Sequence, residues 1–420
     1  MKVCVIGNGG REHALAWRLS ISPSVTKVYA IPGSAAMSDC AELVGIDWQQ
    51  SDHLIRFLKD NHVDLVVVGP EAPLVAGLAD ALDTAGIPVF GPSKAAAQLE
   101  GSKVFAKDLM KKYNIPTAAY GVFHKVDEAK EFIAQTGAPI VVKADGLAAG
   151  KGVVVAMTVE EANAAVEDML SGNRFGEAGS TVVIEEFMEG EEASLLAFVD
   201  GKTVVPMIAS QDHKRIFDGD KGPNTGGMGT YAPAPVLTDT LRDEAMKTIL
   251  EPMVAAMQKE NMPYVGCLYA GLMITPQGPK VVEFNARFGD PETQVVLPLL
   301  DSDLGQIMMA CATGNLTADM VKWKDSSAAC VILASKGYPE TSSKGDVIHG
   351  DIKQHDTTIV FHSGTKLVGE EYVTNGGRVL GVVGLGKDLR TALDRAYGRI
   401  EHINFEGMQY RTDIGAKAFK

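Results

Sequence analysis

The sequence predicts a multidomain α/β protein that begins with a doubly wound parallel sheet. The chain has 420 residues, and at roughly 150 residues per domain this length suggests about three domains. Its first hundred residues alternate short apolar runs with amphipathic stretches, a pattern typical of a parallel sheet covered by helices on both faces. Beyond residue 102 this alternation gives way to predicted strand pairs and a long segment rich in glycine, proline and asparagine.

Four apolar runs in the first hundred residues each end at a turn rich in glycine or proline. The runs are Val3–Ile6, Lys27–Ile31, Asp64–Val68 and Pro88–Phe90, and the turns are Gly7–Gly10, Pro32-Gly33, Gly69-Pro70-Glu71 and Gly91-Pro92. Helical spacing separates the runs, for example from Ala14 to Leu19 and from His53 to Lys59. Ligands of such sheets bind at the carboxyl ends of the strands. We therefore expect a ligand at these turns.

The remaining chain is predicted to mix helices with paired strands. The pattern predicts helices over Lys103–Tyr113 and Glu160–Leu170, strands over Pro139–Lys143, Val153–Ala156 and Thr181–Glu185, and a strand pair over Tyr269–Ile274 and Lys280–Phe284. Toward the C-terminus it predicts strands over Ala329–Ala334, Thr358–His362 and Arg378–Val383, and a helix near Leu389–Ile400. The segment 211–235 shows little periodicity, and loops of that length are usually functional or disordered.

The composition excludes several classes of protein. Lys and Arg number 39 against 53 Asp and Glu, which gives a net charge of −14. This balance argues against a general nucleic-acid binder and against a protein held on an anionic membrane by basic residues. The 5 cysteines form no CxxC pair or zinc-ligand pattern, so free thiols in a reducing compartment are expected. No segment resembles a signal peptide or a membrane span. We therefore expect a cytoplasmic protein.

The first turn, Gly7–Glu12, is a candidate site for a phosphate group. It resembles a dinucleotide fingerprint, but Glu12 stands where the third glycine would be, and no acidic residue follows the second strand. A dinucleotide site is therefore disfavoured. Backbone amides at the start of the following helix suit a phosphate or a phosphosugar. A plain tight turn is the alternative.

A second candidate is the glycine-rich loop 146–152. Gly150-Lys151 is followed by Gly152 and not by Ser or Thr, so the loop is no Walker A motif. Strands are predicted on both sides of it, which makes it the tip of a hairpin. A glycine-rich tip can lay backbone amides over phosphates, and Lys143 on the incoming strand adds positive charge. The alternative is a purely structural hairpin.

A third candidate combines Glu283, Asn285 and Arg287, which are spaced i, i+2, i+4 and would share one face of a strand. A carboxylate and an amide oxygen are hard ligands that suit Mg²⁺ bridging nucleotide phosphates. Arg287 is then placed to meet developing negative charge. Asp290 and Glu292, which follow at once, strengthen the metal hypothesis. A solvated strand face is the alternative.

Together these pieces resemble an ATP-grasp enzyme, and more narrowly the glycinamide ribonucleotide synthetase family. The resemblance covers the whole chain, and its motifs follow one another in the family's order. The motifs are Gly7–His13, Gly69-Pro70-Glu71, Lys143–Gly152, Gln211–Arg215, Gly222–Gly229, Arg287–Thr293 and Tyr410–Gly415. The segment Arg287–Thr293 is the family's own signature.

The resemblance implies a ligation with no protein nucleophile. The carboxylate of glycine attacks the γ-phosphate of ATP, and the amine of 5-phosphoribosylamine then attacks the resulting glycyl phosphate. The products are glycinamide ribonucleotide, ADP and phosphate, in the second step of purine biosynthesis. Catalysis of this kind depends on positioning and on neutralising charge.

The resemblance also implies roles for individual residues. For ATP it implies Lys103, Lys143, Gly146, Gly150, Lys151, Gly152, Glu185, Glu186, Phe187 and Glu192. Among these, Lys103 and Lys143 would meet the phosphates, Glu185, Glu186 and Phe187 would line the adenine edge, and Glu192, with Glu191 as its competitor, would bind the ribose. For Mg²⁺ or Mn²⁺ it implies Glu283 and Asn285, and for catalysis Arg287, Asp212 and Lys214. For phosphoribosylamine and glycine it implies Gly9, Gly10, Arg11, Glu71, His213, Gly226, Gly227 and Asp290.

One position departs from the wider ATP-grasp pattern. Many members have an acidic metal ligand on the strand before the Glu-x-Asn strand, whereas this chain has Gly271 there. Glu283 and Asn285 would then share the metal with waters and phosphate oxygens, or Asp212 would compensate.

The expected division of the chain is an N-terminal phosphoribosylamine-binding domain over 1–101, an ATP-grasp core over 102–325 with a small lid at about 122–188, and a C-terminal α+β domain over 326–420. The expected partners are glycine and phosphoribosylamine, with no nucleic acid and no membrane. A monomer or weak oligomer is expected, with transient contact to neighbouring pathway enzymes. The alternatives are a sister ATP-grasp ligase with another substrate, a nucleotide sensor without activity, and a dehydrogenase.

Overall fold

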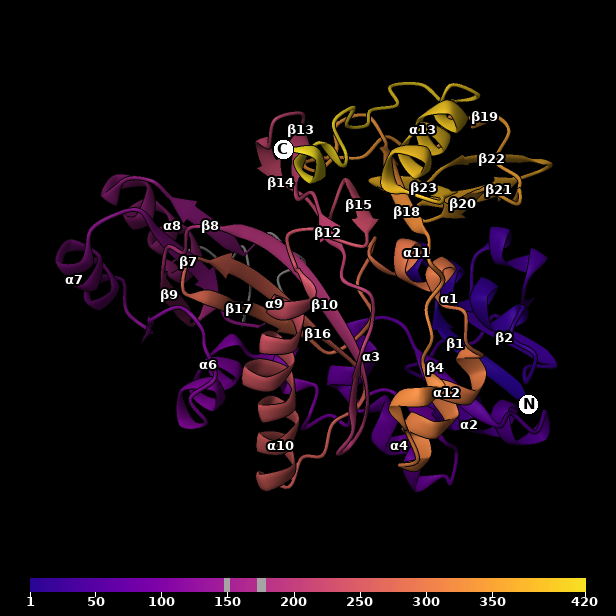
Figure 1. Cartoon of the computed structure of the whole chain (residues 1–420), viewed down its shortest axis with the longest axis horizontal. Coiled ribbons are helices and arrows are strands. Elements are labelled where there is room, and N and C mark those ends of the chain that lie inside the picture. The colour runs from indigo at the N-terminus through magenta and orange to yellow at the C-terminus, as the bar shows by residue number, and fades with distance from the viewer. Residues whose placement is uncertain (147–151, 172–178) are drawn as a thin grey trace.

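A five-stranded parallel sheet forms the N-terminal part of the computed structural model, which describes residues 1–146, 152–171 and 179–420 (Figure 1). Its strands lie in the order β3-β2-β1-β4-β5. They are β1 (Lys2–Gly7), β2 (Lys27–Pro32), β3 (Glu42–Leu43), β4 (Leu65–Val68) and β5 (Val89–Phe90), and the helices are α1 (Gly10–Ser20), α2 (Ser51–Asp60), α3 (Glu71–Ala76) and α4 (Leu78–Thr84). The predicted doubly wound sheet is confirmed. Its order reverses between β1 and β4, the point at which such sheets bind ligands.

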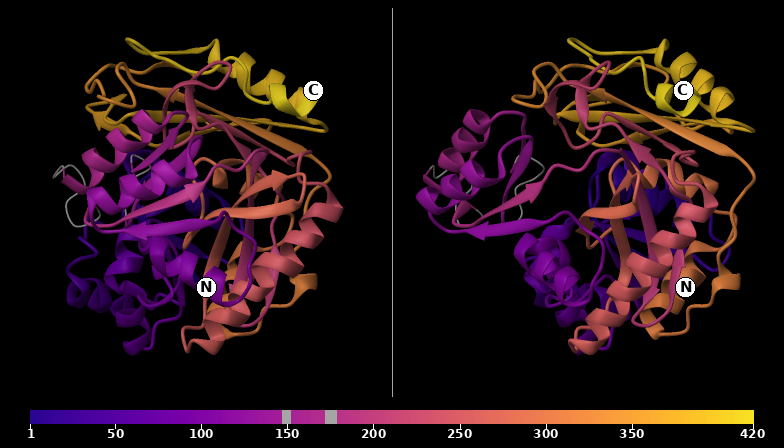
Figure 2. Two further views of the ribbon diagram at one scale, coloured as in Figure 1. Left: turned by 90° about the vertical axis from the view of Figure 1, so that its left-hand side faces the viewer. Right: turned by 60° about the vertical axis from the view of Figure 1, so that its left-hand side comes forward.

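A small subdomain, here called the lid, stands apart from the rest of the molecule (Figure 2). Its antiparallel sheet has the order β6-β9-β7-β8. The lid contains β6 (Tyr120–Phe123), α7 (Val126–Thr136), β7 (Ile140–Ala144), β8 (Val153–Ala156), α8 (Val159–Ser171) and β9 (Val182–Glu186). Its helices and sheet enclose an apolar core of their own. The tip of the predicted glycine hairpin, 147–151, lies outside the described residues.

The central sheet has the order β11-β10-β16-β17 and is antiparallel. Its strands are β10 (Glu191–Asp200), β11 (Val204–Pro206), β16 (Val265–Thr275) and β17 (Gly278–Asn285), and the helices near it are α5 (Gln98–Gly101), α6 (Lys103–Lys112), α9 (Asp239–Ala245), the π-helix Met246–Leu250, α10 (Glu251–Lys259) and α12 (Leu304–Thr313). The predicted strand pair is therefore confirmed. β17 ends at Asn285, so Arg287 lies just beyond the strand on which it was expected.

The C-terminal sheet has the order β12-β15-β18-β23-β20. It is formed by β12 (Gln211–Asp212), β15 (Gly229–Ala232), β18 (Ser327–Ala334), β20 (Thr358–His362) and β23 (Arg378–Gly386), with α11 (Thr293–Val296) and α13 (Leu389–Ile400) nearby. Two-stranded ribbons pair β13 (Arg215–Phe217) with β14 (Lys221–Asn224), β19 (His349–Gly350) with β24 (Ile403–Asn404), and β21 (Thr365–Val368) with β22 (Glu371–Thr374).

The segment 211–235 was expected to be irregular, and this expectation is wrong. It contains four short strands, and β15 pairs with β18, about a hundred residues later. Strands of two to four residues are too short to show the alternation that identifies a strand in a sequence. β13 and β14 pair with each other and β12 pairs with β15, whereas β15 also pairs with β18 far along the chain, so part of this pairing is not local.

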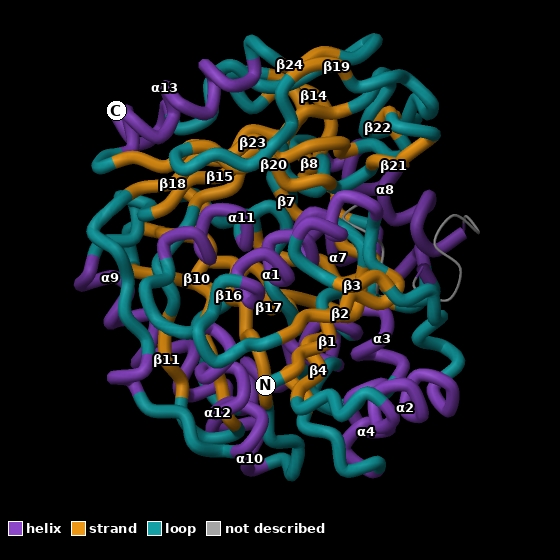
Figure 3. The backbone as a smooth tube through the Cα atoms, turned by 90° about the vertical axis from the view of Figure 1, so that its right-hand side faces the viewer, coloured by secondary structure: helices purple, strands orange, loops and turns teal. Residues whose placement is uncertain are grey.

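Packing joins the N-terminal, central and C-terminal sheets around one region. The rings of Phe90, Phe198 and Phe288 contact one another, with centroids 6.0 to 6.4 Å apart. Helix α1 contacts both α11 and β20, and Figure 3 shows α1 and α11 between the N-terminal and C-terminal sheets. This packing fixes the loop after β17, which carries Arg287. Among the described residues, no helix combines the length and apolar character needed to cross a bilayer.

Candidate active site

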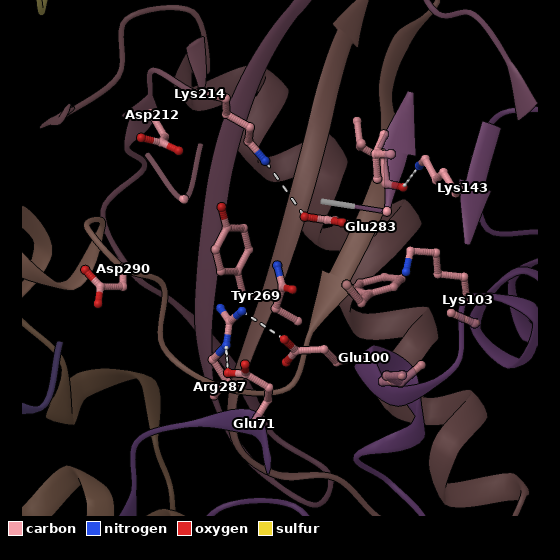
Figure 4. Close-up of a pocket in the computed structure, with 18 of the residues that line it drawn as sticks. Glu71, Glu100, Lys103, Lys143, Asp212, Lys214, Tyr269, Glu283, Arg287 and Asp290 are labelled. Atoms are coloured by element: carbon pink, nitrogen blue, oxygen red, sulfur yellow. Dashed lines mark hydrogen bonds and ion pairs between the residues drawn. The ribbon is translucent and has the colours of Figure 1, made fainter. Parts of the chain in front are cut away.

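A cavity of about 370 Å³, here called the central cavity, lies where the three sheets and the lid meet. Glu71 lines it from the N-terminal region, Lys143 from the lid, Glu283 from the central sheet and Arg378 from the C-terminal sheet. Figure 4 shows Lys103 and Lys143 on one side, Lys214 and Asp212 on the opposite side, and Arg287 between the carboxylates of Glu71 and Glu100. The cavity therefore collects opposite charges from segments far apart in the sequence.

Lys103 lies at the first turn of α6, which begins there because the Ser102 hydroxyl accepts a hydrogen bond from the Phe105 amide at 3.1 Å. The Asp145 carboxylate accepts from the Lys103 backbone N–H at 2.6 Å and so ties this helix start to the end of β7. The Lys103 ammonium donates to the Gly146 carbonyl at 2.9 Å. Burial lowers the pKa of Lys103. A lysine thus stands at the base of the glycine-rich loop.

Glu185 lies between two lysines and is 3% exposed. Its carboxylate is 3.0 Å from the Lys143 ammonium and 3.2 Å from that of Lys107. Burial lowers the pKa of Lys107 to about 8, although Glu185 opposes the shift. The sequence reasoning assigned Glu185 to the adenine edge and missed Lys107, which also lines the cavity. The only sequence signal for Lys107 is its position one helical turn after Lys103.

The candidate metal ligands Glu283 and Asn285 both line the cavity from β17. Burial would raise the pKa of Glu283, but Lys214, Lys143 and Lys103 together lower it below its ordinary value. The carboxylate is therefore ionised at neutral pH. An ionised carboxylate beside an amide oxygen fits a hard divalent cation.

The strand opposite the candidate metal ligands offers no second carboxylate. Gly271 on β16 pairs with Glu283, and a Cβ placed on it would lie 3.4 Å from the Glu283 side chain. Within 1–146, 152–171 and 179–420, no three His, Cys, Asp or Glu residues form a group that could hold a metal. The two oxygens therefore fit a metal that takes its other ligands from phosphates and water.

Arg287 is held between two carboxylates. Its Nη2 lies 2.8 Å from the Glu100 carboxylate and its Nε 3.3 Å from that of Glu71 (Figure 4). Glu100 also accepts from the Ala286 amide at 2.7 Å. Burial would lower the pKa of Arg287, but Glu100 and Glu71 raise it. The sequence reasoning missed Glu100, since its position at the end of α5 carries no motif.

Arg11 lines the cavity, and Glu12 holds it in place. The Glu12 carboxylate accepts from Arg11 Nε at 2.6 Å and from the Gly9 amide at 2.8 Å. Its side chain fills the space between the ends of β1 and β4, because a Cβ at Gly7 or Gly69 would lie 2.4 or 2.2 Å from it. Glu12 thus occupies the crevice that a dinucleotide would need, so the geometry, like the sequence, argues against the dehydrogenase alternative.

The predicted glycines of the first turn lie differently from one another. Gly9 lies close to Asp290, because a Cβ on it would be 3.9 Å from that carboxylate. Gly10 is buried, and a Cβ there would lie 2.3 Å from the Ser363 hydroxyl. It therefore packs against the C-terminal region and does not line the cavity, so a direct substrate contact from Gly10 does not fit its position.

The loop around Asp212 reaches the cavity through alternate residues. Asp212 and Lys214 line it, and the Lys214 ammonium is 3.8 Å from the carboxylates of both Glu192 and Glu283. Burial would lower the pKa of Lys214, but those two carboxylates raise it. Burial, followed by nearby Glu292, raises the pKa of Asp212.

The side chain of His213 points away from the cavity, unlike those of Asp212 and Lys214. It is 1% exposed, its Nδ1 lies 3.0 Å from the Gly229 carbonyl, and its Nε2 accepts from the Gly415 amide at 3.4 Å. Both ring nitrogens are thus engaged with backbone. The expected contact between His213 and substrate does not agree with this position.

Arg378 joins the C-terminal sheet to the loop that contains Gly226 and Gly227. It donates to the carbonyl oxygens of Gly226 at 2.9 Å and of Asp290 at 2.8 Å. Gly226 and Asp290 line the cavity, and Gly227 packs behind it, since a Cβ there would lie 2.7 Å from Asp212. The sequence reasoning missed Arg378, which lies 152 residues from Gly226 and 88 from Asp290 along the chain.

The predicted adenine and ribose contacts are only partly brought to the cavity. Glu192 lines a small adjoining cavity of about 10 Å³, whereas Glu191 lies 3.2 Å from the Gln211 side-chain amide. Glu186 and Phe187 are not among the described residues that line either cavity. Gly152 and Gly146 line the central cavity, and Gly150 and Lys151 fall outside the described residues.

Family models match almost the whole chain. They are the N domain of phosphoribosylglycinamide synthetase over residues 1–100, its ATP-grasp (A) domain over 101–293 and its C domain over 328–417. The chain belongs to the phosphoribosylglycinamide synthetase family. The resemblance found in the sequence is therefore confirmed, and with it the prediction of an ATP-grasp fold.

Individual relatives agree with the family. A phosphoribosylamine–glycine ligase of Halalkalibacterium halodurans is 53% identical over 418 residues, which span 100% of this chain and 97% of the relative. The crystal structure of a phosphoribosylamine–glycine ligase from Thermotoga maritima is 33% identical with a TM-score of 0.86, and the match covers 99% of this chain and 100% of that one. The biotin carboxylase domain of a 2-oxoglutarate carboxylase from Hydrogenobacter thermophilus shares the fold, with 17% identity, a TM-score of 0.75 and coverage of 97% and 91%.

Proposed function

We propose that this chain is a phosphoribosylamine–glycine ligase. It joins glycine to 5-phosphoribosylamine and converts ATP to ADP and phosphate, in the second step of purine biosynthesis. The observation that carries the proposal is the central cavity, where several lysines, the strand with Glu283 and Asn285, and Arg287 held by two carboxylates meet in a chain of this family. The proposed catalytic residues are Arg287, Asp212 and Lys214.

The first step transfers the γ-phosphoryl group of ATP to a carboxylate oxygen of glycine. Lys103 and Lys143 bind the phosphates, because both line the cavity and Lys103 lies beside the start of the glycine-rich loop. Glu283 and Asn285 hold Mg²⁺ or Mn²⁺, which neutralises phosphate charge when it is bound. Magnesium is favoured because the biotin carboxylase neighbour was crystallised with MgADP.

The second step forms the amide bond. The amine of phosphoribosylamine attacks the acyl carbon of glycyl phosphate, the C–O bond to phosphate breaks, and the amine loses a proton. Arg287, held by Glu71 and Glu100, stabilises the charge on the acyl phosphate. Arg11 and Glu71 orient the sugar phosphate from the N-terminal region. Lys214 lines the part of the cavity where the substrate glycine binds, here called the glycine side.

The functional division follows from these roles. Residues 1–101 bind phosphoribosylamine, 102–325 with the lid at about 122–188 bind ATP and glycine, and 326–420 close the site from the C-terminal side. We further propose a cytoplasmic monomer or weak oligomer that meets neighbouring pathway enzymes transiently. The five cysteines are free, which supports a reducing compartment.

ADP release with Mg-ATP and ¹⁸O-carboxylate glycine tests the proposal, with and without phosphoribosylamine generated in place. We expect ADP release to need both substrates and the label to appear in phosphate, because one glycine oxygen leaves with the phosphoryl group. ADP release that ignores glycine would replace our substrate by that of a sister ligase. ATP binding without ADP release under any condition would favour a nucleotide sensor.

A further inference from the structure

The family motif Tyr410–Gly415 lies outside the central cavity, and the proposed reaction gives it no role. It runs instead along the β13–β14 ribbon, which lies between the cavity-lining residues Lys214 and Thr225. We propose that residues 411–415 are a latch that positions the segment 212–227, with Arg411 as its principal positioning residue. This inference rests on the proposed function, because that segment forms the glycine side of the site.

Arg411 is 1% exposed and all of its guanidinium nitrogens are engaged. Its Nη1 donates to the Arg215 carbonyl at 3.1 Å and to the Asp220 carboxylate at 2.9 Å. Its Nε and Nη2 pair with Asp413 at 2.7 and 2.8 Å. A buried, fully paired arginine is rigid, and removing it would leave Asp220 and Asp413 without their shared cation. Arg411 therefore fixes both the start of the ribbon and its turn.

The neighbours of Arg411 repeat the same contact. The Thr412 amide donates to Asp218 at 2.8 Å, and the Thr412 hydroxyl bonds the other oxygen of that carboxylate. The Gly219 amide donates to Asp413 at 2.9 Å. Every one of these bonds joins the C-terminal motif to the turn of the ribbon, about two hundred residues earlier in the chain.

The latch is needed because the ribbon has little core of its own. Beneath it lies a small apolar cluster of Ile216, Met228 and Ala334. The outer side chains are exposed, and Phe217 is 55% exposed. With so little apolar area buried, the polar contacts of the C-terminal motif supply much of what orders this segment.

His213 connects the latch to the residues that line the cavity. The Gly415 amide donates to its Nε2, so Nδ1 must hold the ring proton and donate to the Gly229 carbonyl. Burial lowers the pKa of His213 to about 4, so the ring stays neutral near pH 7. Its chain neighbours on both sides line the cavity, and the Thr225 amide and hydroxyl both donate to the Lys214 carbonyl, at 2.7 and 2.8 Å. A shift of the motif therefore moves the backbone on which Asp212, Lys214 and Thr225 line the glycine side.

Arg411→Lys tests the latch against a matched control, Arg399→Lys. Arg399 is also a C-terminal arginine, with a side chain 9% exposed that pairs with Asp351 at 2.8 Å, but it does not touch the ribbon. We expect Arg411→Lys to raise the KM for glycine by about tenfold while the KM for ATP stays nearly unchanged, because small misplacements of substrate-positioning groups are costly. Arg399→Lys should lower Tm without changing either KM.

A second measurement does not depend on substrate. Hydrogen exchange of the amides in 212–229 should be faster in Arg411→Lys than in the wild type or in Arg399→Lys. If Arg411→Lys does not fold, Thr412→Val with Thr412→Ser as its rescue takes its place, since serine keeps the hydroxyl bond to Asp218. Unchanged exchange, or equal changes in both KM values, would overturn the latch. Wild-type ADP release that ignores glycine would instead overturn the proposed function, and exchange would still decide the latch.

Discussion

The two ends of the central cavity are built on opposite charge ratios. At the lysine end, Lys107 and Lys143 share one carboxylate, that of Glu185. At the arginine end, Arg287 is shared by two carboxylates, those of Glu71 and Glu100. Excess positive charge suits the phosphates of a nucleotide. At the arginine end the two carboxylates fix the orientation of Arg287, and Arg11 also lines the cavity. The comparison teaches that one end of the cavity is arranged to supply positive charge and the other to hold a single guanidinium in a defined position.

Replacement of Lys143, at the lysine end, should have the largest effect on turnover. Lys143→Ala should lower turnover by about 10²- to 10³-fold, because a preorganised charge on the transferring phosphoryl group is removed. The fold should survive, since Glu185 keeps its pair with Lys107 at 3.2 Å. Steady-state ADP release and circular dichroism check both statements. Lys130→Ala is the control, since that lysine pairs with Glu167 on the lid surface. Near-normal turnover of Lys143→Ala would remove the residue from the site.

The arginine end should be the next most sensitive. An ammonium cannot reproduce the separate contacts of Arg287 Nη2 with Glu100 and of Nε with Glu71. Arg287→Lys should therefore lower turnover by about 10- to 100-fold through misplacement of the reacting groups. Arg242→Lys is the control, because its pair with Asp239 is exposed. Equal turnover of the two variants would show that a positive charge at position 287 is sufficient for turnover, without the two separate guanidinium contacts.

The same comparison explains what could be predicted from the sequence. Lys143 belongs to a motif on β7, and Glu283 and Asn285 belong to a motif on β17; the structure brings all three to the cavity. Glu100 and Arg378 were missed because they reach the cavity only through tertiary pairing. Neither carries a local pattern, and neither lies next to the residue it holds.

The irregular segment expected over 211–235 and the substrate contact expected from His213 both differ from what the structure shows, for related reasons. Two of the strands within 211–235, β12 and β15, belong to a sheet whose other strands come from residue 327 onwards, so the local pattern does not reveal them. His213 lies in a motif whose neighbours do reach the cavity, and its sequence position alone gave no sign of the direction of its side chain. Alternation on an extended segment turns successive residues to opposite sides, so Asp212 and Lys214 face the site while His213 faces away. Motif membership identified the segment, and only the fold identified the residue.

The oxygen-donor strand between the two ends is tested by Asn285→Asp. A second carboxylate beside Glu283 adds negative charge to the metal site. The half-saturating Mg²⁺ concentration for ADP release should therefore fall by about tenfold, as ligand charge generally strengthens binding of hard cations. Asn315→Asp, at an exposed position after α12, serves as the control. An unchanged magnesium titration would mean that this strand holds no metal.

The smallest expected effect concerns the pH dependence of stability at the lysine end. The pKa of Lys107 is about 8 in the folded chain, below the 10.5 of a free lysine, because burial disfavours its charge. Between these values the unfolded chain binds a proton that the folded chain does not, so the free energy of unfolding rises with pH. Lys107→Met removes this contribution. The wild-type free energy of unfolding, minus that of the variant, should increase by about 1–3 kcal/mol between about pH 8 and 10.

Urea unfolding across this range measures that difference, with Lys111→Met as the control because Lys111 is exposed on the same helix. Below about pH 8 both states of the wild type hold the proton, so the difference should be constant there. A difference that stays flat up to about pH 10 would mean that Lys107 keeps its charge through the pair with Glu185. The lysine end would then hold its full positive charge over the whole range. If the difference rises, Lys107 loses its proton above about pH 8, and Lys143 becomes the sole partner of Glu185 in this triad.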